Sequence, residues 1–286
     1  MTEGIILKGI GGFYYVDTPE GLIECKARGK FRKTVGKPIV GDRVQLEMQP
    51  DGTGYLMSIA PRRNSLIRPA VANLDLVVAV ASAAPPVTDP FLIDKVTAIA
   101  VHKEITPLVV INKTDADAGD ELYETYRKSG IEVLRVSART GEGIDALRER
   151  ICGKVSAFAG NSGVGKSTLV GALEPGLALR TGSISESHRK GRHTTTFSAM
   201  YPLTGGGFLI DTPGIKGFGL IDIDDHELWH YFPEMMRIGA GCRFYNCTHT
   251  HEPGCAVREA VERGEVARSR YESYLKIRDE DDKYRK

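Results

Sequence analysis

The chain has 286 residues, of which 41% are hydrophobic and 26% are charged, and its formal net charge at pH 7 is +1. A chain of this length is too long for one small hydrophobic core, which predicts two or three domains. Because the net charge is close to zero, the overall charge indicates nothing about binding partners. No apolar run approaches the roughly 18 residues that a membrane span needs, and the first residues lack the basic and apolar regions of a signal peptide. We therefore expect a cytoplasmic protein without a membrane partner.

Residues 1–68 predict a small Greek-key β-barrel of the OB type. Short candidate strands separated by turn signals fill this range, and no helical periodicity interrupts them. In the stretch "DRVQLEM", Val44, Leu46 and Met48 alternate with polar residues and therefore share one face of a strand. Short strands of this kind, without intervening helices, are typical of small closed barrels.

A basic stretch, "KARGKFRKTVGK", lies between two candidate strands of this barrel. Its cations suit phosphate groups and its aromatic ring suits base stacking, so the loop is predicted to bind RNA. An ordinary solvated loop is the alternative, because charge runs are common on protein surfaces. The predicted RNA contacts are Lys26, Arg28, Lys30, Phe31, Arg32 and Lys33.

Residues 69–221 alternate between apolar strands and amphipathic helices, which predicts a mostly parallel, doubly wound α/β sheet. The stretch "LDLVVAVASA" is continuously apolar apart from its Asp and Ser, as expected for a strand buried on both faces. Further strands are expected at 106–112, 131–137, 154–160, 196–203 and 206–212, and helices at 90–104, 119–130, 143–151 and 165–173.

The stretch "GNSGVGKS" matches the phosphate-loop motif G-x-x-x-x-G-K-[ST] and lies between an expected strand and an expected helix. The glycines let backbone N–H groups surround phosphates, Lys166 reaches the outer phosphates, and Ser167 offers its hydroxyl to Mg²⁺. A glycine-rich turn without a ligand is the alternative. The predicted nucleotide contacts here are Gly160, Asn161, Ser162, Gly163, Val164, Gly165, Lys166, Ser167 and Thr168.

Two motifs downstream of the phosphate loop complete a triphosphate site. In "DTPG", Asp211 is predicted to hold Mg²⁺ through water, and the Gly214 N–H to meet the terminal phosphate. In "GRHTTTF", a threonine hydroxyl completes the Mg²⁺ shell, and we favour Thr195 with Thr194 next. The alternative is that these threonines simply begin a strand, where β-branched residues are common.

The stretch "INKTD" predicts recognition of guanine. Asp115 can accept two hydrogen bonds from the N–H edge of guanine, a donor pair that adenine lacks. Asn112 can brace the loop and reach the base, and the stem of Lys113 can lie along the ring. Ser137 and Ala138 follow the next strand, where a backbone N–H can recognise the guanine carbonyl. Alone, the motif is compatible with a polar turn; beside a phosphate loop it favours GTP over ATP.

Residues 222–286 predict a helical domain with a metal site. Cys242, Cys247 and Cys255 cluster with His249 and His251, whereas Cys25 and Cys152 stand apart. Three thiolates and one imidazole form a closed tetrahedral set that is typical of structural zinc, and His249 and His251 compete for the fourth position. Beyond the cluster we expect a helix, a turn near Gly264 and a second helix with a charged end.

The base-reading motifs precede the phosphate loop, which is the reverse of the order in an ordinary small GTPase. Both can be genuine if the chain is circularly permuted, because domain termini are often close in space and rejoining them leaves the sheet unchanged. The permuted chain then runs from about Gly219 into the metal-binding domain, so release of a switch loop could be passed to that domain. Unchanged placement of that domain with a GTP analogue and with GDP would contradict this hypothesis.

With "RRNSLIRP", "ANLD", "NKTD", "GNSGVGKST", "GRHTTT", "DTPGIKGFGL" and the cysteine cluster, the chain resembles the ribosome small-subunit-dependent GTPase A family of bacteria (RsgA, also called YjeQ). The resemblance implies an OB domain, a permuted GTPase domain and a zinc domain with one zinc ion and His249 as the fourth ligand. It also implies a monomer that binds GTP or GDP with Mg²⁺, contacts 16S rRNA on the 30S subunit late in its maturation, and hydrolyses GTP when that subunit stimulates it.

The sequence motifs do not by themselves identify the residue that positions the attacking water. Many GTPases have a Gln directly after the D-x-x-G motif, but this chain has Ile215, which can neither donate nor accept a hydrogen bond. We favour His193, to which the resemblance also points, acting with Lys166 and Thr195; a surface histidine is the alternative. Ile215 also keeps open an RNA-binding module that uses GTP only as a conformational ligand with negligible turnover, and a P-loop ATPase is disfavoured by Asp115.

Overall fold

The protein is described from a computed structural model of the chain. The structure describes residues 1–27, 36–67, 69–177, 198–211, 223–224 and 226–284. The chain divides into two compact units: the first comprises Met1–Leu76, Ile151–Phe158 and Glu174–Ile215, and the second comprises Val77–Arg150, Ala159–Leu173 and Lys216–Lys286. These boundaries do not coincide with the predicted segments 1–68, 69–221 and 222–286, so the three-domain division stays a prediction.

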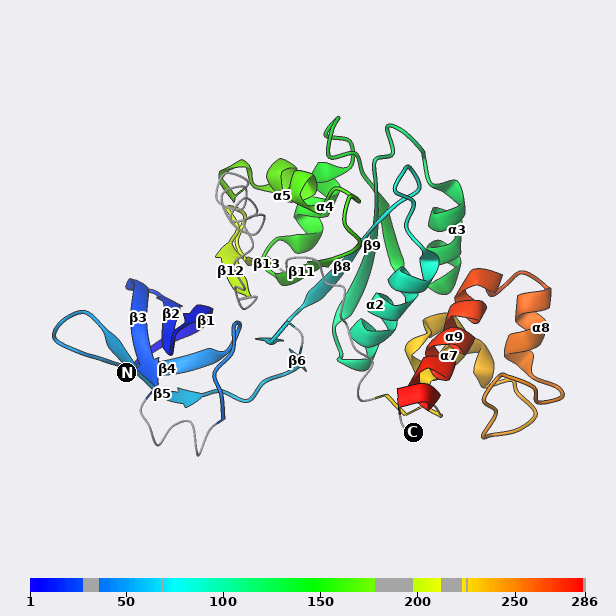
Figure 1. Ribbon diagram of the computed structural model, residues 1–286, viewed down its shortest axis with the longest axis horizontal. Helices are drawn as coiled ribbons and strands as arrows, with labels where there is room; N and C mark the ends of the chain where they lie inside the picture. The colour runs from blue at the N-terminus through cyan, green and yellow to red at the C-terminus, as the bar shows by residue number, and fades with distance from the viewer. Residues whose placement is uncertain (28–35, 68, 178–197, 212–222, 225, 285–286) are drawn as a thin grey trace. The chain divides into compact units, whose positions relative to one another are not determined.

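Strands β1 to β5 of the first unit form a closed barrel (Figure 1). β1 pairs with β2 and β4, β2 pairs with β3, and β5 joins β3 to β4, which closes the ring as in an OB fold. Val44 and Leu46 lie in the core with Ile6, Val16 and Leu56, which confirms the alternation for these two residues, whereas Met48 is half-buried and outside that cluster. The bounds are β1 Thr2–Ile10, β2 Phe13–Thr18, β3 Gly21–Ala27, β4 Arg43–Met48 and β5 Gly54–Ile59.

The first unit also contains the strands that precede and follow the phosphate loop. β11 (Val155–Ala159) pairs in parallel with β13 (Phe208–Asp211), and β13 pairs antiparallel with β12 (Ala199–Pro202). β12 in turn meets β1 of the barrel at Ala199 and Lys8. The connection from the barrel forms a short pair, β6 (Ser65–Leu66) with β7 (Val71–Ala72).

The second unit contains the base-side strands in the order β10-β9-β8, with β9 and β10 parallel. Every residue of β8 is buried, as its apolar sequence predicts. Helix α2 begins where Asp89 accepts a hydrogen bond from the Phe91 N–H and Pro90 occupies the first turn. The bounds are β8 Leu76–Ser82, β9 Thr106–Asn112, β10 Glu132–Arg135, α2 Pro90–His102, α3 Asp120–Ser129, α4 Ile144–Ile151 and α5 Lys166–Leu173.

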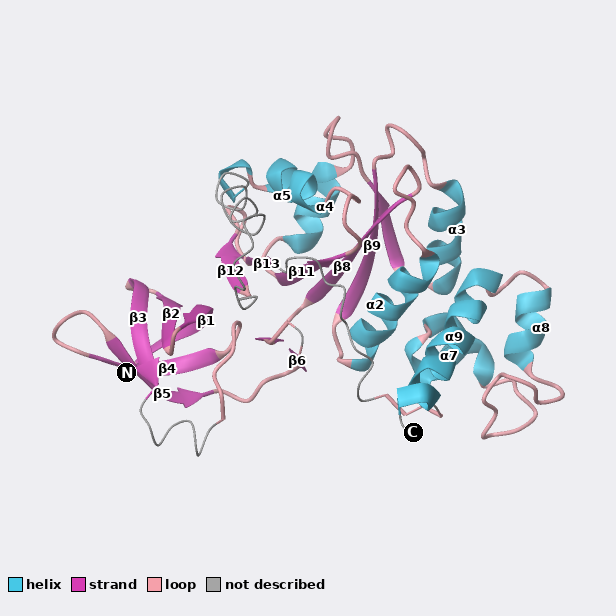
Figure 2. Ribbon diagram, in the orientation of Figure 1, coloured by secondary structure: helices cyan, strands magenta, loops and turns pink. Residues whose placement is uncertain are grey.

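The end of the chain is helical and belongs to the second unit (Figure 2). It contains η1 (Leu228–Tyr231), α7 (Pro233–Gly239), α8 (Ala256–Glu262) and α9 (Arg268–Tyr284). Gly264, with φ of +74°, lies in the turn between α8 and α9, so the predicted helix–turn–helix ending is confirmed. In the described ranges, every helix falls short of the length and apolar character that crossing a membrane requires.

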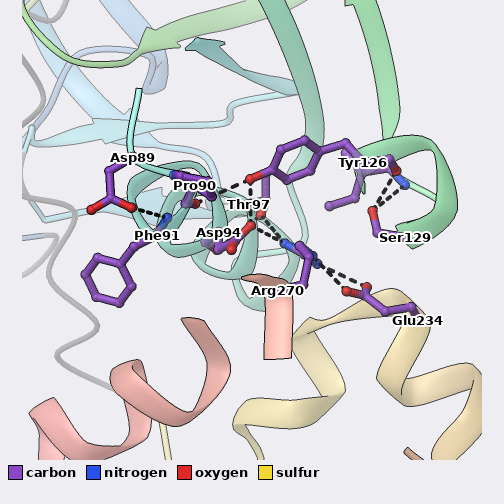
Figure 3. Close-up of polar contacts among 10 residues, drawn as sticks. Asp89, Pro90, Phe91, Asp94, Thr97, Tyr126, Ser129, Glu234 and Arg270 are labelled. Atoms are coloured by element: carbon purple, nitrogen blue, oxygen red, sulfur yellow. Dashed lines mark hydrogen bonds and ion pairs between the residues drawn. The ribbon is translucent and has the colours of Figure 1, made fainter. Parts of the chain in front are cut away.

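A buried ion network holds α9 against α2 and α7 (Figure 3). Arg270 donates to both carboxylate oxygens of Glu234, at 2.7 and 3.0 Å, and to Asp94 at 2.7 Å. The Tyr126 hydroxyl on α3 donates to the same Asp94 oxygen at 2.8 Å. Because all four side chains are buried, the network fixes the C-terminal helices on α2 and α3 through groups that water does not screen.

Candidate nucleotide and metal sites

Asn112 joins the base loop to the phosphate loop. It ends β9 with its side chain buried, and its Nδ2 donates to the Val164 carbonyl in the phosphate loop at 2.9 Å. Its Oδ1 accepts from the Ala138 N–H at 3.1 Å. One amide therefore spans three motifs that are separated in the sequence, and the structure brings them together as the sequence predicted.

The Asp115 carboxylate has partners on both of its oxygens. Ser137 Oγ donates to Oδ1 at 2.5 Å, and the Arg139 guanidinium lies 2.5 Å from Oδ2. The hydrogen bond from Ser137 outweighs desolvation and, with the charge of Arg139, lowers the pKa of Asp115. The carboxylate is therefore ionised at neutral pH. The sequence reasoning missed Arg139, although a basic residue directly after "SA" was a readable signal.

A loop after β8 supports both nucleotide motifs and was also missed. Lys113 has φ of +67°, and its Nζ donates to the Pro85 carbonyl at 2.8 Å. Pro86 lies so close to Gly163 of the phosphate loop that a Cβ on this glycine would approach the proline ring to 2.8 Å. The available signal was a Pro-Pro pair at the carboxyl end of a buried strand, the edge at which α/β proteins bind ligands.

The phosphate loop requires glycine where it passes Asn112. Gly165 has φ of +93°, and a Cβ there would collide with Asn112 Nδ2. The next residue, Lys166, begins α5 and donates through Nζ to the carbonyls of Gly160 and Asn161, at 2.6 and 2.7 Å. Burial lowers the pKa of Lys166. The lysine is thus folded over the loop whose backbone would surround phosphates.

The remaining residues of the phosphate loop differ in solvent exposure. Val164 is buried, whereas Ser162, Ser167 and Thr168 are exposed, the last two in the first turn of α5. An exposed hydroxyl at Ser167 is compatible with the predicted contact to Mg²⁺.

Several predicted residues lie outside the described ranges. Asp211 is the last residue of β13, so the strand expected at 206–212 is confirmed over Phe208–Asp211. The residues outside are Gly214, His193, Thr194 and Thr195, together with Arg28, Lys30, Phe31, Arg32 and Lys33 of the basic loop. Lys26 was expected on a loop but lies within strand β3, where it is exposed with its Nζ 4.8 Å from the centre of the Phe13 ring.

The cysteine cluster forms a compact set of four metal ligands. The ligand atoms of Cys242, Cys247, His249 and Cys255 all lie within 4.8 Å of one another. His249 Nδ1 lies 3.5 Å from the Cys242 sulfur and 3.4 Å from the Cys255 sulfur. His251 is exposed, and its Nδ1 contacts the Thr250 hydroxyl at 2.8 Å, so the geometry favours His249.

Burial favours the uncharged forms of these ligands in the absence of a cation. It raises the pKa of Cys247 to about 12, raises that of Cys255 and lowers that of His249. A bound cation reverses this tendency for thiols, because coordination deprotonates them. Three thiols and one imidazole in contact are the donor set of structural zinc.

Helix α9 also supports the loop that carries His249. Tyr271 donates to the His249 carbonyl at 2.7 Å, and Tyr274 donates to the Thr248 carbonyl at 2.5 Å. His249 itself has φ of +58°, an uncommon conformation for a residue other than glycine, and the Trp229 ring packs edge-on against it. The loop is therefore held by contacts outside the ligand set.

A phosphate loop bonded to a base-reading loop that precedes it in the chain, together with an OB barrel and a cysteine–histidine cluster, defines a P-loop protein with permuted motif order. The family model of the RsgA GTPase matches residues 59–221, and that of the RsgA N-terminal domain matches residues 3–56. The chain belongs to the RsgA family of GTPases. The resemblance read from the sequence, the fold class and the assignment as a GTPase are thereby confirmed.

Relatives and solved structures agree with this assignment over nearly the whole chain. Two relatives named small ribosomal subunit biogenesis GTPase RsgA are each 44% identical to this chain. The one from Bacteroides fragilis aligns over 99% of both chains, and the one from Caldanaerobacter subterraneus subsp. tengcongensis aligns over 96% of this chain and 94% of its own. The crystal structure of YjeQ from Thermotoga maritima matches with a TM-score of 0.83 and 39% identity over 98% of both chains. YloQ, described as a circularly permuted GTPase, matches with a TM-score of 0.81 and 34% identity over 100% of this chain and 96% of its own.

Proposed function

We propose that this GTPase acts on the small (30S) ribosomal subunit late in its biogenesis and hydrolyses GTP when bound there. The observation that carries the proposal is the double hydrogen bonding of Asn112, which holds the base loop and the phosphate loop as one site. The names of the relatives support the choice of partner. We place the activity in the cytoplasm and expect a monomer that contacts 16S rRNA.

The base half of the site would select guanine. The Asp115 carboxylate would accept from the ring N–H and the exocyclic amino group of guanine, while adenine offers no such pair of donors. The Ala138 N–H, which donates to Asn112 Oδ1 at 3.1 Å, would turn to the guanine carbonyl, while the bond from Asn112 to the Val164 carbonyl keeps the two loops together. Lys113 would extend along the face of the base, and Asn112 would keep the loop in register.

The phosphate half would stabilise the charge that develops during hydrolysis. Lys166 would exchange its two carbonyl contacts for phosphate oxygens, and Ser167 would coordinate Mg²⁺ with Thr195 and, through water, Asp211. Magnesium bound with GTP would supply positive charge that stabilises the phosphates. We propose that Gly214 meets the terminal phosphate and that His193 positions the attacking water once the subunit is bound.

The other parts of the chain would dock the enzyme. We assign the basic loop of the barrel, from Lys26 to Lys33, to rRNA backbone and bases. The cysteine–histidine cluster would hold one structural Zn²⁺ per chain, because four protein ligands leave no open position for catalysis.

The test is release of phosphate from GTP by the full chain, alone and with purified small subunits. We expect slow turnover alone, strong stimulation by small subunits, and none by large subunits or with ATP. His193→Ala should abolish the stimulated turnover while GTP affinity survives. Negligible GTP turnover with small subunits present would instead favour an RNA-binding module that uses GTP as a conformational ligand.

A further inference from the structure

Arg139 forms an ion pair with Asp115, the carboxylate that is expected to bind the base. Its guanidinium lies 2.5 Å from Asp115 Oδ2, while Ser137 binds the other oxygen of the same carboxylate. The Asp115 side chain is 13% exposed and the Arg139 side chain is 75% exposed. The carboxylate is thus fixed in the loop, whereas the arginine reaches it from solvent.

The guanidinium and guanine present the same chemistry to this carboxylate. Both offer adjacent N–H donors in one plane, which is the arrangement that a carboxylate binds in bidentate fashion. Guanine would use both oxygens of Asp115 in the proposed site, so Arg139 and guanine would compete for Oδ2. Ser137 is a weaker competitor because its hydroxyl is a neutral donor.

We propose that Arg139 is an internal competitor of the guanine base and sets the affinity of the site for guanine nucleotides by binding Asp115. The inference rests on the proposed guanine site. Because GTP and GDP share the base, the competition weakens both, and it favours release of GDP when Arg139 recaptures the carboxylate. Adenine nucleotides do not use Asp115, so the competition lowers the affinity for guanine nucleotides alone. It therefore reduces the ratio by which the site prefers guanine over adenine.

The sign of one substitution separates this role from ordinary charge attraction. Arg139→Ala removes a cation, which by itself weakens binding of an anionic nucleotide. Removing a competitor has the opposite effect and strengthens nucleotide binding. Because the competing ion pair is partly exposed, its loss should increase the affinity for GDP about two- to fivefold. Arg127→Ala is the matched control, because it removes an exposed arginine paired with Glu124 on α3, which leaves Asp115 untouched.

The experiment is titration calorimetry of GDP with the full-length wild type, Arg139→Ala, Arg139→Lys and Arg127→Ala. We expect tighter binding by Arg139→Ala, an intermediate value for Arg139→Lys, and no tightening for Arg127→Ala. The gain should shrink as salt screens the pair. Unchanged or weaker binding by Arg139→Ala overturns the inference, whereas a wild type that binds no guanine nucleotide refutes the proposed function instead.

A second measurement shows whether Arg139 acts through the carboxylate. Asp115→Asn replaces an acceptor by an amide donor, which complements xanthine because xanthine has a carbonyl where guanine has the amino group. In this background Arg139→Ala should give no gain in affinity for xanthosine diphosphate, and at most a small loss from the missing cation, since the ion pair no longer exists. An equal gain in both backgrounds would mean that Arg139 acts through the fold of the loop, and would overturn the inference.

Discussion

Replacing Arg270 by methionine tests what the buried network contributes to stability. Arg270 is 1% exposed and lies between Asp94 and Glu234, whose side chains are 0% and 1% exposed. Methionine fills part of the same volume but carries no charge, so Arg270→Met leaves two buried carboxylates without a cation. Removing one partner of a buried ion pair typically costs about 3–5 kcal/mol, because the remaining charge keeps its desolvation penalty.

The expected loss is large enough to measure by several methods. About 4 kcal/mol corresponds to a decrease of roughly 8–16 °C in Tm for a unit of this size. Chemical denaturation gives the free energy of unfolding, and hydrogen exchange should show faster exchange in α2, α7 and α9. Arg263→Met is the matched control, because Arg263 pairs with Glu265 on the surface and its loss should have no measurable effect.

The pH dependence of the variant gives an independent check. Burial raises the pKa of Asp94 even with Arg270 beside it, and removal of the guanidinium should raise it further. A carboxyl whose folded-state pKa is raised contributes stability that is fully present below its unfolded pKa of about 3.9 and is lost as the pH rises through the folded pKa. The penalty of Arg270→Met should therefore be larger at pH 8 than at pH 5. A variant within about 1 kcal/mol of the wild type at both pH values would refute the reasoning.

Three further predictions concern the nucleotide site, the metal and their connection. Gly165→Ala should weaken GDP binding of the folded protein at least tenfold by calorimetry, because the new Cβ displaces Asn112, and the strained backbone should also lower the unfolding temperature; unchanged affinity would contradict this. Metal analysis should find one zinc per chain, and chelation should increase hydrogen exchange in α8 and α9; a protein indifferent to chelation would argue against a structural metal. The distance between spin labels on α2 and α9 should be the same with a GTP analogue and with GDP. A change in this distance would show that the buried Arg270–Asp94 contact breaks.

Local chemistry made much of the fold and site predictable. Val44 and Leu46 identified a barrel strand because side chains alternate across a sheet, and this depends on neighbouring residues alone. Gly165 and Lys166 were predictable because a loop around phosphates requires specific backbone angles and a cation. The cysteine cluster was predictable because few other residue sets bind a metal at that spacing.

Contacts between distant residues could not be predicted in this way. Arg270 lies in a highly charged stretch that is typical of a solvated helix, yet its partner Asp94 is 176 positions earlier in the chain. Nothing in either local sequence requires the pairing, because burial of a charge is decided by what packs around it. The Arg139–Asp115 pair depends likewise on two loops that meet only after β9 and β10 align.

The two contact faces of α9 limit how a nucleotide signal can reach the metal cluster. Tyr271 and Tyr274 hold the His249 loop, and Arg270, one residue before Tyr271, clamps the helix to Asp94 on α2. Separating the cluster from α2 would pull Arg270 away from Asp94 and expose the surface that α9 buries on α2, and both losses oppose movement of one without the other. A signal that leaves the "DTPG" motif along the chain is therefore expected to move the cluster together with α2, so the metal-binding helices follow the base-reading half of the enzyme.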